Sequence, residues 1–397
     1  MTNLQKFSYD IVFGDQKITL STGTLAPQTN ASVLAQWGGT MVLATVIMGK
    51  ADEEKDYFPL SVEFVDKLYA GGMIKGGKWI KREGGPSDAA IIFGRILDRS
   101  LRPLFPEGFM NEVQIIATVL SNDKDHDVVI PAFLAAAAAL SISDVPFTGP
   151  VSIARIGLIN GELVVNPTIS QLANSQMDLL ACTDINGINM IEADANIIDN
   201  DTMLKALNLA NTTGNNINKQ IADIVKEIGK PKAAYTPILP SAELLAEVEK
   251  NLQPELEKFI NDGVDGGHMA AEGVILEKIE GDYADKIEKE EIKKPLLFAA
   301  VESVIRKYVR QSTLKGRRYD KRALDEIRPL DIKAGVLAST HGSALFQRGL
   351  TQAITVTTLG PLSEKQFLQD SLGETTKRYI HYYSAMPFST GQSGKVG

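Results

Sequence analysis

The residues best suited to chemistry in this chain form two groups of positively charged side chains. Residues 305–322 carry eight Arg or Lys side chains and only one Asp. The loop 70–85 (AGGMIKGGKWIKREGG) adds Trp79, Lys81 and Arg82 in a glycine-rich setting that cannot bury much surface. Guanidinium and ammonium groups bind phosphates. The group at 305–322 therefore favours contact with a polyanion, with a solvated helix end as the alternative, and the loop 70–85 is free to touch a ligand.

The overall composition is that of a globular protein with two or three domains. The chain has 397 residues, of which 44% are apolar and 23% are charged. Its net charge of −8 is unevenly distributed, because residues 241–291 hold 15 Asp or Glu against 5 Lys. The rest of the chain therefore sums to +2, and the acidic total does not argue against a polyanionic partner.

Two further features bear on the cellular compartment. The sequence has no run of ~18 uninterrupted apolar residues, and its N-terminus lacks the layout of a secretion signal. Its one cysteine, Cys182, excludes an internal disulfide and fits a reducing environment. We therefore expect a cytoplasmic protein with no membrane partner, in which Cys182 is a small buried apolar residue.

Short strands alternate with helices over the first 200 residues, which predicts an α/β fold. We expect strands at 9–20, 40–48, 57–64, 113–121, 151–158, 163–165, 177–181 and 188–191, and helices at 86–102 and 132–140. The pair Asn160-Gly161 predicts a tight hairpin turn between two of these strands.

The helix at 86–102 brings its arginines to one face, because side chains advance ~100° per residue around a helix. These arginines are Arg95, Arg99 and Arg102. They offer cations near the loop 70–85, while the opposite face is apolar. Asp98 borders the cationic face, so ion pairs within the fold are an equal alternative to ligand contact.

The pattern changes near residue 202, after which helices dominate. We expect them at 203–210, 217–228, 241–252, 254–260 and 295–310, with little strand signal between them. Residues 202–310 therefore read as a helical insert. Strand signal returns at 353–359 and 378–383.

An internal repeat links the two ends of the chain. Residues 32–49 align with 343–360 at a fixed offset of 311, with six identities and no gap. The identities include Gly38 and Gly349, each opening a Gly-x-Thr sequence. Chance similarity between two hairpins is the alternative, but the shared spacing favours a duplicated domain.

Three familiar motifs are incomplete. The segment 72–78 resembles a P-loop, but the next residue is Trp79 rather than the Ser or Thr that binds Mg²⁺. Asp123, Asp125 and Asp127 resemble the start of an EF-hand loop without its glycine and final glutamate, so a polar turn is expected. The four histidines are too scattered for a zinc site.

Several longer motifs resemble the bacterial polynucleotide phosphorylase family. They occur in the family's order and cover nearly the whole chain: Lys81-Arg82-Glu83-Gly84, Arg102-Pro103-Leu104-Phe105-Pro106, 111–123, Gly316-Arg317-Arg318-Tyr319-Asp320, Ile327-Arg328-Pro329-Leu330, 340–346 and Pro387-Phe388-Ser389. The resemblance implies two ribonuclease PH-like α/β cores, the second incomplete, joined by an all-helical domain. It divides the chain into a first core at 1–145, the C-terminal part of that core at 146–215, a helical linker at 216–312 and the start of the second core at 313–397.

The resemblance also implies a homotrimeric ring that degrades single-stranded RNA from its 3′ end. In the family, inorganic phosphate attacks the terminal phosphodiester and releases a nucleoside diphosphate, and the reverse reaction polymerises RNA. Two anions must meet in such a site, which requires cationic and N–H donors and a Mg²⁺ on carboxylates. A non-catalytic RNA-binding ring or scaffold subunit with the same fold is the alternative.

The resemblance assigns seven candidate RNA contacts by their position in its motifs. They are Trp79, Lys81, Arg82, Arg317, Arg318, Arg322 and Arg348. The first three match a loop that narrows the family's RNA channel, with Trp79 where a Phe is usual. The others match the basic entry to the second core and the residue before its Gly-x-Thr.

Four positions depart from the family's pattern. Gly85 replaces an arginine of the loop, Lys321 replaces a glycine, and Gly39 and Leu350 stand where an acidic residue is usual. The second copy of the repeat also ends at Gly397, before the basic loop and Arg-bearing helix that follow the first copy. The family's catalytic residues and Mg²⁺ ligands lie in that stretch. We therefore expect no catalytic or metal-binding residue among these 397 residues, and no activity from this chain alone.

Overall fold

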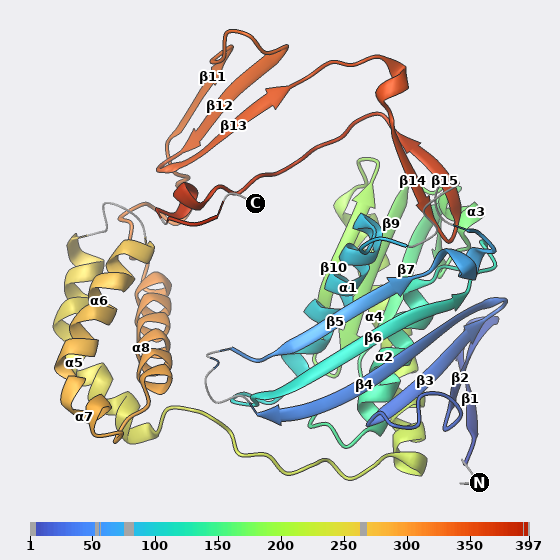
Figure 1. Cartoon of the computed structure of the whole chain (residues 1–397), viewed down its shortest axis with the longest axis horizontal. Coiled ribbons are helices and arrows are strands. Elements are labelled where there is room, and N and C mark those ends of the chain that lie inside the picture. Colours follow the sequence, from blue (N-terminus) through green and yellow to red (C-terminus); the bar gives the residue numbers. More distant parts are fainter. Residues whose placement is uncertain are drawn as a thin grey trace.

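The computed structural model describes residues 5–51, 55, 57–74, 83–262, 268–391 and 393–395 (Figure 1). These residues form a two-sheet α/β unit, a unit made of helices, a three-stranded sheet and a separate two-stranded hairpin. The α/β class and the all-helical unit expected from the sequence are both present.

The first sheet contains six strands in the order β1-β2-β3-β4-β6-β5. They are β1 (Phe7–Phe13), β2 (Gln16–Thr22), β3 (Ala31–Trp37), β4 (Thr40–Ala51), β5 (Leu60–Asp66) and β6 (Asn111–Ser121). Neighbouring strands are antiparallel except β5 and β6, which run parallel. The prediction of one strand at 9–20 is wrong, because Gly14 takes a φ of +61° and turns the chain into the β1–β2 hairpin.

The second sheet contains four strands in the order β10-β9-β7-β8. They are β7 (Ser152–Ile159), β8 (Glu162–Val165), β9 (Met177–Asp184) and β10 (Gly187–Ala195). Between β7 and β8, Asn160 and Gly161 both have positive φ angles, 53° and 83°, as a tight hairpin turn of this kind requires. The predicted turn is confirmed, and Cys182 on β9 is fully buried as expected.

Helix α2 (Val129–Ile142) lies in the centre of the α/β unit. Every residue of α2 is buried, and the helix contacts β3, β4 and β6 of the first sheet as well as β7 of the second. Its run of alanines allows this close approach on all sides. Helix α1 (Asp88–Leu101) covers β5, where Gly94 faces the Val62 carbonyl oxygen so closely that a Cβ would lie 3.2 Å from it.

Helix α4 (Asn200–Ile228) is continuous, although two helices were predicted there. Its buried residues, among them Ile217 and Ile221, pack against the α/β unit rather than against the other helices. The boundary expected between residues 215 and 216 therefore falls inside a single helix.

The helical unit consists of α5 (Ala242–Asp262), α6 (His268–Asp282), α7 (Ala284–Glu288) and α8 (Lys294–Leu314). Val248, Leu252 and Leu256 of α5 are buried in its own core together with residues of α8. The prediction that Pro254 separates two helices is wrong. Apolar residues on both sides of Pro254 pack into one core, which outweighs the hydrogen bond that proline removes.

The second copy of the repeat forms a three-stranded sheet with the order β11-β12-β13. Its strands are β11 (Leu330–Ala334), β12 (Gly342–Arg348) and β13 (Thr351–Thr357). Leu34 pairs with Leu43 in the first copy and Leu345 with Ile354 in the second, and every other β3–β4 pair is repeated at the same offset of 311. The predicted duplication is therefore confirmed at the level of hairpin register.

The chain then forms the hairpin of β14 (Gln366–Asp370) and β15 (Gly373–Lys377), which no sequence signal had indicated. The strand predicted at 378–383 is absent, and Tyr382 and Tyr383 are 81% and 87% exposed. A strand needs a hydrogen-bonded neighbour, and these residues pair with none in the described part of the chain.

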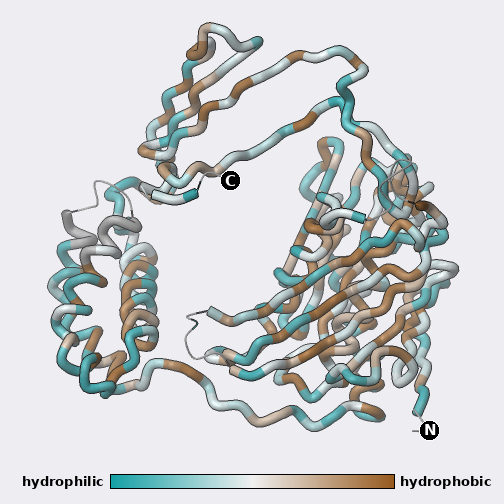
Figure 2. The backbone as a smooth tube through the Cα atoms, in the orientation of Figure 1, coloured by the Kyte–Doolittle hydropathy of each residue, from teal (hydrophilic) through white to brown (hydrophobic). Residues whose placement is uncertain are grey.

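Apolar residues occur along the strands of the third sheet as they do along those of the first (Figure 2).

The short helices are η1 (Leu68–Gly71), η2 (Arg102–Leu104), α3 (Ile169–Leu172), η3 (Leu362–Glu364) and η4 (Pro387–Thr390). Across the described ranges, no helix combines the length and apolar character that a membrane crossing requires.

Candidate functional site

Three of the predicted RNA contacts fall in the segment 75–82, outside the described residues: Trp79, Lys81 and Arg82. The next residue, Glu83, is held at the end of β5. Its Oε2 lies 3.1 Å from Lys67 Nζ, and its Oε1 accepts a hydrogen bond of 3.0 Å from the Leu68 N–H. The first described residue after the predicted contacts is therefore fixed to the first core.

Arg95 of α1 and Arg102 of η2 line an open cleft of about 1310 Å³ between β5, α1 and β14. Arg99 pairs with Glu192 of β10 at 2.8 Å. Arg102 pairs with Asp98 at 2.7 Å and donates to two backbone carbonyls of the β5 region. Ion pairing within the fold is therefore confirmed for these two side chains. The exposed guanidinium of Arg95 has no such partner among the described residues.

Two of the predicted RNA contacts form ion pairs within the fold. Arg318 and Arg322 both bind Asp320, with Arg318 Nη2 at 2.9 Å and Arg322 Nε at 3.0 Å from its Oδ2. Both guanidiniums also donate to the carbonyl of Glu326. Burial opposes ionisation of Asp320, but hydrogen bonds from Arg322 and the charges of both arginines leave its pKa below the usual range. Arg318 and Arg322 therefore hold the turn at 318–326.

The other two described candidates, Arg317 and Arg348, are exposed. Neither guanidinium has a hydrogen-bonding or ion-pair partner within the residues that the structure describes. Arg348 ends β12 opposite Leu330 and Thr351. Nearby, Arg328 Nη1 reaches Thr351 Oγ1 at 3.4 Å. Among the predicted contacts that the structure describes, Arg317 and Arg348 are therefore the two whose guanidiniums remain available to bind a phosphate.

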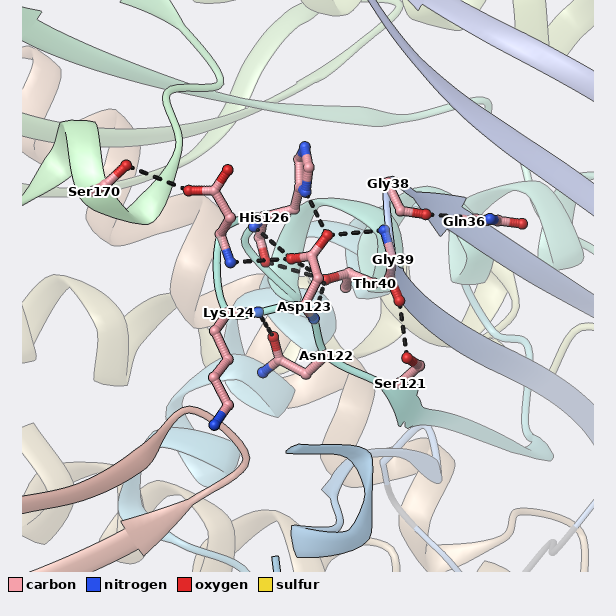
Figure 3. A network of polar contacts seen from close by, with 11 residues as sticks. Gln36, Gly38, Gly39, Thr40, Ser121, Asn122, Asp123, Lys124, His126 and Ser170 are labelled. Carbon is pink, nitrogen blue, oxygen red and sulfur yellow. Dashed lines mark hydrogen bonds and ion pairs between the residues drawn. The ribbon is translucent and has the colours of Figure 1, made fainter. Parts of the chain in front are cut away.

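A polar network in the first core joins the β3–β4 turn to the loop before α2 (Figure 3). Asp123 lies at its centre and accepts hydrogen bonds from the Gly39 N–H at 2.8 Å and from Thr40 Oγ1 at 3.0 Å. It also accepts from the N–H groups of Asp125 and His126 and lies 2.6 Å from His126 Nδ1. The His126 ring in turn packs at a tilt of 53° against Trp37, with ring centroids 4.8 Å apart.

This network sets the charge state of Asp123. Partial burial favours the neutral acid, but the hydrogen bonds from His126, Asp125 and Gly39 outweigh it and hold the pKa of Asp123 well below its usual range. The ionised carboxylate therefore links two loops that are 83 residues apart in the sequence.

The aspartates 123, 125 and 127 form a turn, as predicted, rather than a cation site. Asp127 binds Arg155 Nη1 at 2.6 Å and accepts from the Val129 N–H, and Asp125 Oδ1 lies 3.3 Å from Ser170 Oγ. No three His, Cys, Asp or Glu side chains in the described part of the chain are grouped so as to hold a metal ion. The described residues therefore do not fit a Mg²⁺ site.

Comparison with known proteins accounts for this fold. Residues 15–146 match domain 1 of the 3′ exoribonuclease family, and residues 149–213 match domain 2 of the same family. The chain belongs to the 3′ exoribonuclease family. Its α/β unit is the ribonuclease PH-like core of that family, and the sheet β11-β12-β13 begins a second core of the same kind.

Curated relatives confirm the resemblance to polynucleotide phosphorylase. Polyribonucleotide nucleotidyltransferase of Chloroflexus aurantiacus is 40% identical over 405 residues, covering 100% of this chain and 53% of the relative. The protein of the same name from Halalkalibacterium halodurans is 37% identical, covering 99% and 55%. This member of the family thus spans about half the length of the curated relatives it matches. Among solved structures, rice Rrp46 matches 53% of this chain and 95% of its own, with 14% identity and a TM-score of 0.45.

Two features of this family member were missed by sequence reasoning. The first is the Asp123–His126–Trp37 network, for which the only sequence signal was the alternation of aspartates expected to form a turn. The second is the buried tip of the β14–β15 hairpin, for which no sequence signal was present because its partners Asn122 and Asp66 are distant in the sequence.

Proposed function

We propose that this chain is part of a phosphorolytic 3′-to-5′ exoribonuclease that acts on single-stranded RNA. An oxygen of inorganic phosphate attacks the phosphorus of the 3′-terminal phosphodiester, and the 3′ oxygen of the preceding nucleotide leaves with the electron pair. The product is a nucleoside diphosphate, and the reverse reaction lengthens RNA. The observation that carries this proposal is the 40% identity to polyribonucleotide nucleotidyltransferase over the whole chain.

The residues of this chain serve to bind and orient the strand in this proposal. Arg317 and Arg348 contact backbone phosphates, together with Lys81 and Arg82, while Trp79 stacks on a base. Arg318 and Arg322 act indirectly, because they hold the turn that presents Arg317. Phosphate is the co-substrate and Mg²⁺ the cofactor, and no residue of this chain is assigned to the reacting groups or to the metal. The assembly is a cytoplasmic homotrimer.

The reaction is tested by the release of nucleoside diphosphates from poly(A) in the presence of inorganic phosphate. We expect the complete gene product to release them and this chain alone to release none. Release by this chain alone would contradict the assignment of the reacting groups. A complete gene product that binds RNA without releasing product would instead favour a non-catalytic RNA-binding scaffold.

The loop contacts are tested with the double variant Lys81→Ala/Arg82→Ala. Each phosphate that the protein no longer neutralises flattens the dependence of log K on log salt concentration by about 0.7 for a single strand. We therefore expect weaker oligo(A) binding and a flatter salt slope, measured by fluorescence anisotropy. An unchanged slope would exclude contact by the loop.

Arg317→Ala and Arg318→Ala form a matched pair that separates binding from folding. Arg317→Ala should flatten the salt slope without changing the melting temperature, because its side chain is exposed. Arg318→Ala should lower the melting temperature of the second repeat, because it leaves Asp320 with one guanidinium partner instead of two. Equal effects of the two variants on both measurements would contradict this division of roles.

A further inference from the structure

The tip of the β14–β15 hairpin is buried against the first core. Ser371 at this tip is 1% exposed, although most residues of β15 are exposed. Its Oγ accepts a hydrogen bond of 2.7 Å from Asn122 Nδ2, and its N–H lies 3.3 Å from Asp66 Oδ2. These partners stand 249 and 305 residues earlier in the chain. The contact therefore joins the part of the chain after the second repeat to the first core.

The fit at this contact leaves no free space. A Cβ on Gly71 of η1 would lie 1.9 Å from the Ser371 carbonyl oxygen, so the two backbones touch. Burial raises the pKa of Asp66, the hydrogen bonds from Ser371 oppose that rise, and the charges of Asp370 and Glu83 add to it. The hairpin tip thus supplies a donor to Asp66 Oδ2, while Asp66 Oδ1 is buried without a hydrogen-bond partner among the described residues.

A short path leads from this contact to the predicted RNA contacts. Asp66 is the last residue of β5, and the next two residues, Lys67 and Leu68, hold both oxygens of Glu83. Glu83 directly follows the predicted RNA contact Arg82 in the sequence. A displacement of the hairpin tip would therefore loosen the end of β5 and the residue anchored to it.

We propose that Ser371 is a positioning residue for RNA binding. It holds the end of β5 in place. Through Lys67, Leu68 and Glu83 it determines where the RNA strand meets the first core. This inference rests on the proposed function, because it names a residue that acts on the same RNA contacts without touching RNA. It assigns to the β14–β15 hairpin the role of coupling the second repeat to RNA binding by the first core.

The test measures binding of fluorescently labelled oligo(A) to the whole chain as a function of salt concentration. Ser371→Ala leaves Asn122 Nδ2 without its acceptor. Losing one buried hydrogen bond should raise the population of the detached hairpin tip about tenfold. We expect a several-fold loss of affinity and a salt slope flatter by about 0.7 for each phosphate that is no longer bound. If Ser371 had a purely structural role, the variant would contain less protein able to bind RNA, and the salt slope of binding would be unchanged.

Gly71→Ala provides a second perturbation that removes no polar group. Its methyl group displaces the Ser371 backbone, so it should reproduce both effects of Ser371→Ala. The matched controls are Thr375→Ala, an exposed residue of the same hairpin, and Gly281→Ala in α6, where a Cβ meets nothing within 4 Å. Both controls should bind like the unaltered chain.

The results distinguish the positioning role of Ser371 from the proposed function in RNA binding. If the unaltered chain binds oligo(A) and both tip variants keep its affinity and slope, while hydrogen exchange at residues 366–377 rises, the positioning role is overturned. If affinity falls with an unchanged slope, Ser371 is only structural and the inference is again overturned. If the unaltered chain binds no oligo(A), the proposed function fails in this chain and the positioning role fails with it.

Discussion

The β3–β4 and β12–β13 hairpins have the same register but different surroundings. Ala35 pairs with Val42 in the first, and Phe346 pairs with Ala353 in the second, at the same offset of 311. Ala35 is fully buried under α2, whereas Phe346 is 41% exposed and no helix covers its face within the described residues. The comparison teaches that the repeated sequence is enough to specify pairing and turn. Burial depends on elements from elsewhere in the chain.

The same difference holds at the turns of the two hairpins. Gly38 and Gly349 have nearly equal φ angles of +58° and +60°. The first turn is tied to Asp123 and faces His126, while the atoms nearest to a Cβ at Gly349 in the second belong to the flexible side chain of Arg328. Three sets of substitutions test how far this difference in surroundings extends.

The largest effect is expected for an acidic residue at the equivalent positions 35 and 346. Ala35→Asp places an unpaired carboxylate in the core and should lower the free energy of unfolding by about 4 kcal/mol or more. Phe346→Asp should cost less than about 1 kcal/mol, because its carboxylate remains in water. Urea unfolding followed by circular dichroism measures both. Similar losses would mean that the third sheet is covered in solution.

A smaller effect is expected for Asp123→Asn, which removes the charged acceptor tying the first turn to the loop before α2. We expect a loss of about 3 kcal/mol at pH 7, because several hydrogen bonds to a charged group weaken together. The folded-state pKa of Asp123 is lowered, so its stabilisation is present above an unfolded pKa of roughly 4 and is lost as pH falls through the folded-state value. The difference between unaltered chain and variant should therefore stay constant from pH 7 to about pH 5 and shrink below that. A difference that shrinks between pH 7 and pH 5 would contradict this account.

The smallest effects are expected at the two glycines. Gly349→Ala should cost about 1 kcal/mol, because alanine is strained at a positive φ. Gly38→Ala should cost about 2 kcal/mol, since its Cβ would also lie 2.5 Å from His126 Cε1. Thermal unfolding of both variants checks the order. A larger loss for Gly349→Ala would reverse the comparison of the two turns.

The sequence predicted those parts of the fold that depend on local chemistry. The Asn160-Gly161 turn follows from the conformational freedom of those two residues, and the helix before Pro103 follows from its apolar spacing. The errors arose where distant partners decide. Pro254 does not end α5, because packing against α8 outweighs its local effect. Residues 378–383 have strand composition but pair with no strand among the described residues.

The candidate site shows the same division. Charge clustering drew attention to residues 305–322, but composition could not show which guanidiniums are paired within the fold. Asp320 binds two of them through a close turn, which leaves Arg317 as the exposed member of its motif. Ser371 gave no signal at all, because its importance comes from Asn122 and Asp66, which are distant in the sequence.

The complete burial of α2 has a consequence for how the first core unfolds. Because this helix packs against strands of both sheets, neither sheet can separate without exposing an apolar helix to water. The two halves matched by domains 1 and 2 of the family therefore behave as a single cooperative unit, which melts in one transition. If the chain were cut between these two segments, we expect the two pieces to remain associated, because α2 packs against both sheets.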